Sequence, residues 1–503
     1  MTSGNLWVVA PMLWLAFGAF GIYLFARLIS SRSELLAAGT ALILVGALVS
    51  LIILAQDPAL VASEAAWGNF APGGVVLRAR PIAILVSGIA LGMGICVAIY
   101  SGCYLSLDRR YTTYYSLLLL MILGLLGMVK ADDLFTLYLF TELMSISTYV
   151  LVALRRHTDT AVEAGFKYLI IGGTGTITLL MGVALIYRAT GTTAIVVPSS
   201  PDIWTRAGIA CLWTGLGIKS AIVPGHTWLP DAYGRAPSSV NALSSAALIQ
   251  GPLYVLLRTS LIFGLTPERI GLALILLSFA NMTVGNVMAL LQTNVKRLLG
   301  YSTIAQMGYV MFILGVGFRH GEPEAFRAGI FLILAHAVMK GLAFLSKGAC
   351  HFYCGTTTIA DLRGIARRLP FPAVAFALSL VGLASVPPLA GFSAKWFLLS
   401  RAIQPGDPLV MAGLVLVLVN TVVSLGYYLP LAVNVFAGGA APQRTPAPDD
   451  AAEGRVPTQP PISRQVAISV WMVIPLVVLA LLVVWIGFQP DPWWQLIATV
   501  EAF

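Results

Sequence analysis

A lysine lies inside one of the most apolar stretches of the sequence, where a titratable amine is costly. Lys219 follows the apolar run 209–218 and precedes Pro224, which should break the same helix. A lysine near the centre of a bilayer costs roughly 2.5–3.5 kcal/mol on insertion scales, so its presence indicates a functional site. The prolines Pro387-Pro388 followed by Lys395 repeat this arrangement later in the chain. The pattern predicts two broken helices, each beside a buried amine that could carry a proton.

Glu142 is a second titratable group in an apolar run, within residues 134–151. A lone carboxylate at such a position would be neutral or paired. Lys219 is the expected partner, because an amine that separates from its carboxylate holds its proton less tightly, which suits a proton carrier. The alternative for Glu142 is a structural hydrogen bond between two helices.

A stripe of basic groups follows later in the sequence. His336 and Lys340 are four residues apart, and Lys347 lies seven residues further on, so all three fall on one narrow face of a helix. Groups aligned in this way could hand protons along the helix. The alternatives are a satisfied polar pair in a helix interface for His336 and Lys340, and a side chain that snorkels to the cytoplasmic surface for Lys347.

The composition requires a membrane protein with many spans. The 503 residues are 58% hydrophobic and 10% charged, with a mean hydropathy of +0.88. No basic stretch precedes the first apolar segment, so we expect no cleavable signal peptide. Segments of about 17–25 apolar residues predict an all-α polytopic membrane protein with about fourteen transmembrane helices, near 5–27, 35–55, 81–104, 112–130, 134–154, 165–187, 207–224, 239–262, 270–291, 300–317, 327–346, 371–398, 408–435 and 466–487.

The two interrupted segments organise these helices into a predicted repeat. Paired breaks in corresponding positions are the sequence sign of an inverted-repeat transporter with its site near the membrane midplane. The stretch before the last helix is rich in proline and alanine and mixed in charge, which is typical of a flexible loop. We expect N-terminal helices in 1–110, a first five-helix repeat in 111–262, a second inverted repeat in 263–436, a cytoplasmic loop in 437–464 and a C-terminal helix in 465–503.

Basic residues predict the orientation of the helices. Alternate loops, beginning with the first, are richer in lysine and arginine than the others, whose basic residues include Lys130. By the positive-inside rule the richer loops are cytoplasmic, so both termini are expected outside the plasma (inner) membrane. The net charge of +9 is then a topology signal and not a nucleic-acid site. The richer loops carry Arg27, Arg32, Arg109, Arg110, Arg155, Arg156, Arg235, Lys296, Arg297, Arg363, Arg367, Arg368, Arg444, Arg455 and Arg464.

Sequence signs of a cofactor are weak. Cys350, His351 and Cys354 offer three ligands at a spacing unusual for a metal site, so we expect ordinary packing and no metal there. No P-loop or dinucleotide fingerprint follows a predicted strand, and no soluble domain is expected. We therefore expect no cofactor in this chain.

An ordered series of motifs, from about residue 80 to about residue 430, resembles one family of membrane subunits. The resemblance is to the antiporter-like subunits shared by respiratory complex I, membrane-bound hydrogenases and multisubunit Mrp cation/proton antiporters. The motifs are Glu142-Leu-Met-Ser-Ile-Ser-Thr-Tyr149, Gly165-Phe-Lys167-Tyr168, Lys219-Ser-Ala-Ile-Val-Pro224-Gly-His226-Thr-Trp228-Leu-Pro230-Asp231, Lys296-Arg297-Leu-Leu-Gly-Tyr301-Ser302, His336-Ala-Val-Met-Lys340 and Pro387-Pro388-Leu-Ala-Gly391-Phe392-Ser-Ala-Lys395.

This resemblance implies a fourteen-helix subunit that conducts protons through a half-channel in each repeat. It implies Glu142 and Lys219 as the coupling pair, His336 and Lys340 as the central bridge, and Lys395 as the terminal donor to the outside. Further groups that would relay protons or order water are Lys167, His226, Gln250 and Lys347.

Gln250 departs from the family pattern, because many relatives carry a titratable lysine or histidine at this position. An amide orders water but cannot accept and release a proton at accessible pH. Either a water chain covers the gap from Lys219 to His336, which we favour, or the path is weakened and the subunit is largely structural.

A proton relay does no work unless partners stabilise its charge states differentially. We therefore expect other membrane subunits as partners, with redox chemistry located in them, as in a quinone oxidoreductase or a hydrogenase. Two alternatives stay open: a subunit of an Mrp-type Na⁺/H⁺ antiporter without redox chemistry, and a mainly structural or energising membrane arm. Transport of Na⁺ beside H⁺ is also left open, because Glu142 is the only obvious acid within the membrane.

Overall fold

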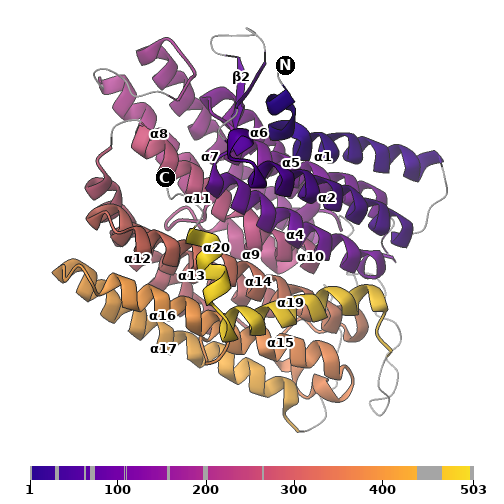
Figure 1. The fold of residues 1–503 in the computed structure, drawn as a ribbon. Coiled ribbons are helices and arrows are strands. Elements are labelled where there is room, and N and C mark those ends of the chain that lie inside the picture. The colour runs from indigo at the N-terminus through magenta and orange to yellow at the C-terminus, as the bar shows by residue number, and fades with distance from the viewer. Residues whose placement is uncertain are drawn as a thin grey trace.

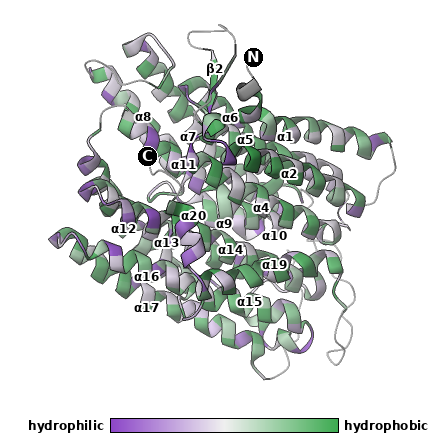
Figure 2. Cartoon of the chain, in the orientation of Figure 1, coloured by the Kyte–Doolittle hydropathy of each residue, from purple (hydrophilic) through white to green (hydrophobic). Residues whose placement is uncertain are grey.

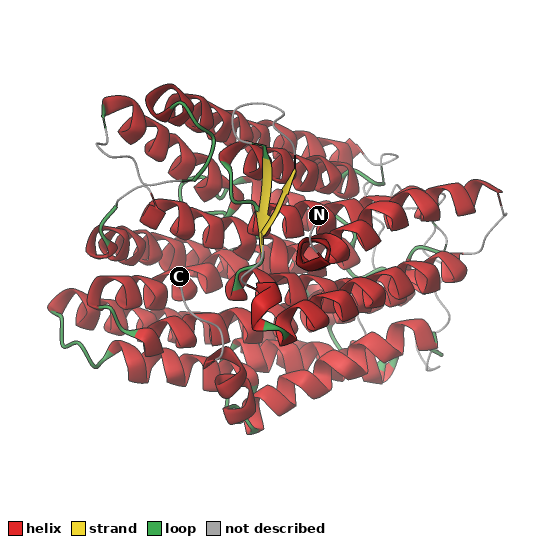
Figure 3. Cartoon of the chain, turned by 45° about the horizontal axis from the view of Figure 1, so that its top comes forward, coloured by secondary structure: helices red, strands yellow, loops and turns green. Residues whose placement is uncertain are grey.

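The computed structural model describes residues 3–28, 33–61, 64–67, 74–106, 108, 110–155, 159–195, 202–262, 265–438 and 467–498. Helices dominate this part of the chain and lie side by side (Figure 3). All but the first two residues of the predicted loop 437–464 lie outside the described residues, as do Arg32, Arg109, Arg156, Arg444, Arg455 and Arg464.

The helices are numbered in chain order. Those of the first half are α1 Ser3–Leu28, α2 Ser33–Gln56, α3 Pro58–Val61, α4 Pro81–Tyr104, α5 Tyr111–Lys130, α6 Leu134–Val152, α7 Asp159–Thr190, α8 Ile203–Lys219, α9 Trp228–Arg235, α10 Ser238–Leu243, the π-helix η1 Ser244–Leu248 and α11 Gln250–Ile262. Those of the second half are α12 Pro267–Leu290, α13 Val295–His320, α14 Pro323–Cys354, the short 3₁₀ turns η2 Ala360–Leu362 and η3 Ile365–Arg367, α15 Pro370–Leu383, α16 Ala390–Ala402, α17 Pro408–Phe436, α19 Val470–Phe488 and α20 Asp491–Ala498.

The chain is a multi-pass membrane protein. Twelve helical stretches in the described residues are long and apolar enough to cross a membrane, with α10, η1 and α11 together making one of them. The two other expected spans, 207–224 and 371–398, are those predicted to be broken. The first ends as a helix at Lys219, and the second is divided between α15 and α16.

Burial separates a core of helices from an outer layer. Nearly every residue of α13 is buried, and α14 and α11 are similarly enclosed, whereas α7 and α17 expose apolar side chains such as Ile177 (70%) and Val422 (66%). Figure 1 shows α13 and α14 in the middle of the bundle, between the N-terminal helices and α15 to α19. Hydrophobic residues cover the helix bodies in Figure 2. Such exposed apolar surface suits a lipid environment.

The prediction of a purely helical chain misses one β-hairpin. Strand β1 (Glu64–Trp67) pairs antiparallel with β2 (Val75–Arg78), as Figure 3 shows in yellow. Each strand has only four residues, too short to give a periodic signal in the sequence. The hairpin is fixed to the α5–α6 connection, because the Asp132 N–H donates to the Val76 carbonyl of β2 at 2.8 Å.

The two helix breaks share a backbone pattern. Ala221 (φ 53°) and Ser385 (φ 62°) adopt left-handed backbone conformations, each three residues before a proline, Pro224 or Pro388. Lys219 precedes its break, whereas Lys395 follows its own within α16. The two lysines therefore both adjoin a break but occupy different register positions.

The second break depends on a close backbone approach, which generates a prediction. A Cβ atom on Gly391 would lie 1.9 Å from the Gly382 carbonyl oxygen, whereas a Cβ on Gly92 of α4 would meet nothing within 4 Å. We expect Gly391→Ala to destabilise the protein by about 1–3 kcal/mol. Gly92→Ala should leave the melting temperature unchanged or raise it, because alanine favours helices. Thermal unfolding of the detergent-solubilised protein, followed by tryptophan fluorescence, measures both; equal melting temperatures would contradict this description of the break.

Candidate functional site

At the first break, polar side chains form hydrogen bonds with the backbone groups that the interrupted helix leaves free. Asn281 of α12 accepts a hydrogen bond from the Val223 N–H at 2.8 Å and donates to the Ala221 carbonyl at 3.3 Å. The Trp228 indole, at the start of α9, donates to the Ile218 carbonyl at 2.8 Å. Because buried peptide groups need partners, these contacts allow α8 to end inside the bundle and present Lys219 there.

The Lys219 amine docks on two hydroxyl groups of α6. Its side chain is 3% exposed, and Nζ donates to Ser145 Oγ and to Tyr149 OH, each at 2.7 Å. Glu142 lies one helical turn earlier on α6, and its buried Oε2 has no hydrogen-bond partner among the described residues. Glu142 is in electrostatic range of Lys219, but the two form no ion pair in the described part of the chain. The structure brings the predicted pair together without direct contact.

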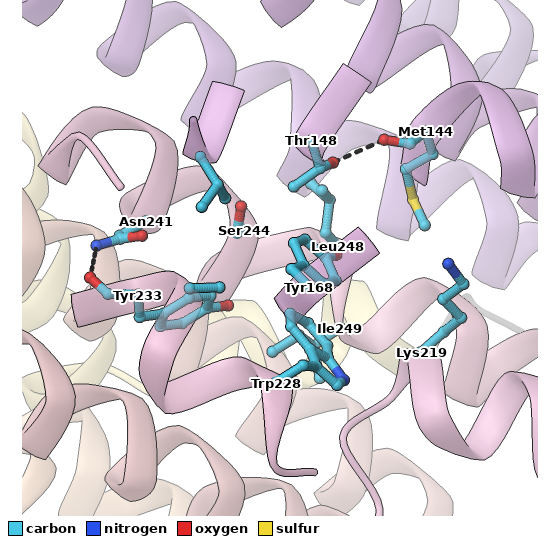
Figure 4. A pocket seen from close by; sticks show the side chains of 12 residues that line it. Met144, Thr148, Tyr168, Lys219, Trp228, Tyr233, Asn241, Ser244, Leu248 and Ile249 are labelled. Carbon is cyan, nitrogen blue, oxygen red and sulfur yellow. Dashed lines mark hydrogen bonds between the residues drawn. The ribbon is translucent and has the colours of Figure 1, made fainter. Parts of the chain in front are cut away.

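A small cavity extends from Lys219 to the π-helix η1. About 10 Å³ of it is accessible to the centre of a water molecule, which is about the space of a single water. Figure 4 shows Lys219 at one end of this cavity and Tyr233 and Asn241 at the other. Tyr233 OH, Asn241 Oδ1 and Ser244 Oγ are buried and have no hydrogen-bond partner within the described ranges. Thr148 also lines it, and the other lining residues are apolar or aromatic, among them Met144, Val152, Tyr168, Trp228 and Leu248.

Gln250 begins α11, directly after η1, and His336 of α14 lies beside η1. Both are buried, at 2% and 0% exposure. Both side-chain polar atoms of Gln250 and both ring nitrogens of His336 lack partners among the described residues. His336 lies near the backbone of Ser245, within η1. π-helical turns occur often at functional sites, and this one places unpaired polar groups between the two halves of the bundle.

Lys340 follows one turn after His336 on α14. It is fully buried, and Nζ donates to the Leu299 carbonyl at 2.8 Å and to Ser302 Oγ, both on α13. Thr303 Oγ1 also donates to the Leu299 carbonyl and lies 3.0 Å from Ser245 Oγ of η1. The predicted stripe of His336 and Lys340 therefore faces both α13 and η1.

Lys347 does not reach the surface, contrary to the snorkelling alternative. It is fully buried, and Nζ donates to the Thr356 carbonyl at 2.9 Å. The short connection after α14 folds back over the helix end, which a hydropathy pattern does not show. His351 Nδ1 contacts the same carbonyl at 2.9 Å, and the described residues contain no metal-binding cluster of His, Cys, Asp and Glu side chains.

Lys395 ends the series within a second polar network. It is 5% exposed; Nζ donates to Thr421 Oγ1 at 2.9 Å and lies 4.4 Å from the centre of the Tyr309 ring. Asn286 of α12 donates to Tyr309 OH at 3.2 Å and accepts from Tyr427 OH at 2.8 Å. This network connects α12, α13, α16 and α17 around the amine.

Two predicted site residues, Lys167 and His226, lie apart from the buried amines described above. Lys167 is half-exposed and forms ion pairs with Glu163 at 2.7 Å and Asp231 at 3.6 Å. His226 is half-buried in the first break, and its Nδ1 has no partner among the residues described. Neither residue contacts the Lys219 amine.

The sequence-based prediction missed several polar residues of the site. Ser145 and Tyr149 were within a quoted motif, but no role was assigned to them, and Asn281 and Asn286 are isolated asparagines within apolar helices. Their type and position could have indicated them, since buried amides need partners. Lys130, read as a loop residue, is fully buried at the end of α5 and donates to the Val8 carbonyl at 3.0 Å.

Buried amines beside interrupted membrane helices are typical of membrane proteins that move ions or small solutes. Residues 131–423 match the family described as "NADH:quinone oxidoreductase/Mrp antiporter, TM". The chain belongs to this family, as the sequence motifs predicted, and is an antiporter-like membrane subunit.

Related proteins agree with this assignment. The chain is 34% identical over 403 residues to NADH-quinone oxidoreductase subunit N 2 of Symbiobacterium thermophilum, covering 76% of this chain and 78% of the relative. A chain of the archaeal membrane-bound sulfane sulfur reductase superposes with a TM-score of 0.84 at 25% identity, covering 98% of this chain and 96% of that one. A chain of the Mrp complex from Dietzia sp. DQ12-45-1b shares the fold, with a TM-score of 0.84 at 24% identity, covering 99% of this chain and 97% of that one.

If Asn281 stabilises the first break, its removal should destabilise the protein. Asn281→Ala leaves a buried N–H and a buried carbonyl without partners, which should cost about 1–3 kcal/mol of stability. Gln292→Ala, just beyond the end of α12, is the control, because that half-buried amide donates to the Met288 carbonyl of α12 and does not contact the break. Chemical denaturation measures both variants. An Asn281→Ala protein as stable as Gln292→Ala would show that Asn281 does not hold the break.

Proposed function

We propose that this chain conducts protons through the membrane, as one subunit of a multisubunit complex whose redox chemistry resides in partner subunits. The observation that carries the proposal is the series of buried basic groups Lys219, His336, Lys340 and Lys395, placed at the helix breaks and in the core. Glu142 is the acid beside the first of them. Buried ionisable groups in membrane helices mark ion pathways and proton relays.

The segment from Lys219 to His336 supports a water-linked path across Gln250. Buried polar atoms in proteins are almost always hydrogen-bonded, to protein or to ordered water. Tyr233, Asn241, Ser244, Gln250 and His336 all carry buried polar atoms without a partner in the described residues. Water between these groups would satisfy them, and a hydrogen-bonded water chain also carries protons. This favours the water-chain interpretation over a broken path.

The segment from Lys340 to Lys395 is lined by side chains. Lys340 donates to Ser302, and Tyr428 lies beside Ser302. The rings of Tyr427 and Tyr428 contact each other in a tilted arrangement, with their centres 4.3 Å apart, and the Tyr427 hydroxyl donates to Asn286 in the network around Lys395. Hydroxyl and amide groups therefore line the segment between the Lys340 and Lys395 amines.

The finer architecture belongs to the same proposal. Counting each interrupted helix as one span gives fourteen spans, with α5 to α11 and α12 to α17 as two inverted five-helix repeats. The shared backbone pattern at Ala221 and Ser385 supports the repeat. We include in the proposal that the chain lies in the plasma (inner) membrane, and the positive-inside rule supports an orientation with both termini outside.

The three candidate functions differ in what the partner subunits do. The relative in Symbiobacterium thermophilum is named as a quinone oxidoreductase subunit, and the archaeal neighbour comes from a respiratory complex, which favours a redox-driven assembly. The family description also includes Mrp antiporters, so a Na⁺/H⁺ antiporter subunit is the second candidate. A structural arm is the third; it would not account for a line of buried amines.

The first test removes the coupling pair. Glu142→Ala and Lys219→Ala should each lower proton translocation by about 10²-fold or more, because each removes a proton-transfer group. The measurement is proton uptake into liposomes by the complex isolated with its native partners, during turnover. Unaltered proton uptake in both variants would rule out the proposed path.

A second test addresses Gln250. Gln250→Leu keeps the volume but removes both polar atoms, so proton uptake should fall about tenfold as one water partner is lost. Gln250→His restores a polar, titratable group and should preserve transport. Full activity of Gln250→Leu would contradict a water path at this position.

A further inference from the structure

The Lys219 amine lies on a pair of neutral hydroxyls although a carboxylate is close by. Ser145 and Tyr149 both accept from Nζ at 2.7 Å, while Glu142 retains a buried oxygen without a partner among the described residues. Ser145 Oγ itself donates to the Thr141 carbonyl at 2.7 Å, so its lone pairs are free to receive the amine. This position of the amine is therefore built by specific contacts and is distinct from contact with Glu142.

Hydroxyl groups and a carboxylate differ in how they interact with the ammonium form and the neutral form of an amine. An ionised carboxylate only accepts hydrogen bonds, so it favours the ammonium form. A tyrosine hydroxyl can accept from an ammonium and can donate to the lone pair of a neutral amine. The Ser145–Tyr149 pair therefore accommodates Lys219 in either state, whereas Glu142 favours one of them.

The two positions are within reach of one lysine side chain. Glu142 and Ser145 are three residues apart on α6, which corresponds to about 4.5 Å along a helix axis. A lysine stem has four flexible carbons, so the amine can move between them without moving α8. The face of α6 that carries Glu142, Ser145 and Tyr149 thus offers the amine successive hydrogen-bond acceptors.

Tyr149 is held in place from two sides. A Cβ atom on Gly172 of α7 would lie 2.5 Å from the Tyr149 hydroxyl, so the glycine permits this position. The Tyr149 ring meets the edge of Tyr168 at 4.6 Å, and Tyr168 stacks on Trp228 at 4.1 Å. Because Trp228 donates to the Ile218 carbonyl, the hydroxyl and the lysine backbone are fixed relative to each other across the break.

We propose that Ser145 and Tyr149 form a second docking position for the Lys219 amine, and that its transfer from Glu142 to these hydroxyls releases the proton toward the cavity. This inference rests on the proposed function. On release one Nζ–H bond breaks, and the proton bonds to a water molecule in the cavity, beside Ser244 and Asn241. The neutral amine then accepts a hydrogen bond from Tyr149. Ser145 and Tyr149 are positioning residues, because they act through Lys219.

Few other titratable groups face this amine. Within the described residues these are Glu142 and Tyr149 of α6, Tyr168 of α7 and Tyr233 of α9. The neighbouring α10 and η1 contribute the neutral side chains of Asn241 and Ser244. A change in the pH dependence caused by Tyr149 or Ser145 therefore reports on Lys219 and Glu142.

The test uses hydroxyl deletions in the complex isolated with its partners, reconstituted in liposomes. We expect Tyr149→Phe and Ser145→Ala each to slow proton uptake about tenfold and to move its half-maximal rate to lower pH, since an acceptor for the ammonium is lost. Ser145→Thr keeps the hydroxyl and should restore both rate and pH profile. Tyr138→Phe is the matched control, a hydroxyl deletion on the same helix at a ring that packs on Phe135, and should behave as wild type.

The outcomes separate this inference from the proposed function. A slower rate with an unchanged pH profile in Tyr149→Phe and Ser145→Ala would indicate a structural role and overturn the docking position. Wild-type behaviour of both variants, with Lys219→Ala inactive, would overturn the docking position and leave the proposed function standing. Wild-type transport by Lys219→Ala would overturn both. If Tyr149→Phe fails to assemble, the Ser145→Ala and Ser145→Thr pair decides.

Discussion

An amine buried away from water is stable only when oxygen atoms replace its hydration, and this constraint shapes the whole molecule. Lys130, Lys219, Lys340 and Lys395 are each at most 5% exposed, and each donates to carbonyl or hydroxyl oxygens. The ion pairs of the described residues involve other, more exposed side chains. Neutral acceptors can hydrogen-bond a charged amine and still allow it to lose its proton. A contacting carboxylate, in contrast, would favour the charged form. Groups held in this way can take up and release protons.

The helix breaks follow from the same constraint. A continuous α-helix offers no free carbonyl or N–H to a neighbour within the membrane, whereas a break does. At the first break Asn281 satisfies the freed backbone, and the end of α8 presents Lys219 to α6. The π-helix η1 acts similarly between the first break and α14, where Ser244 lines the cavity beside Lys219 and Ser245 lies near His336. Irregular backbone is thus concentrated where polar side chains meet.

Much of this arrangement could be predicted from the sequence. Apolar segments located the spans, and prolines beside lysines located both breaks, because these are local properties of the chain. The contacts of Lys219 could not be predicted, since whether its amine meets Glu142 or lies one turn away depends on the relative position of α6 and α8. The burial of Lys130 was missed because a basic residue at a helix end reads as a loop residue until the packing of α1 is known. Lys347 was placed on the helical stripe, but a side chain reaching the surface stayed open as an alternative, because the path of the connection after α14 is not visible in the sequence. The hairpin β1–β2 was too short to recognise.

The central claim is that the buried basic groups belong to one continuous polar path, with water bridging the region around Gln250. A density map of the assembled complex, at a resolution that places individual water molecules, tests this directly. We expect ordered water within hydrogen-bonding distance of Gln250 and of the His336 ring nitrogens, continuous with the cavity beside Lys219. A dry region, in which these side chains pair directly with protein groups and close the cavity, would contradict it.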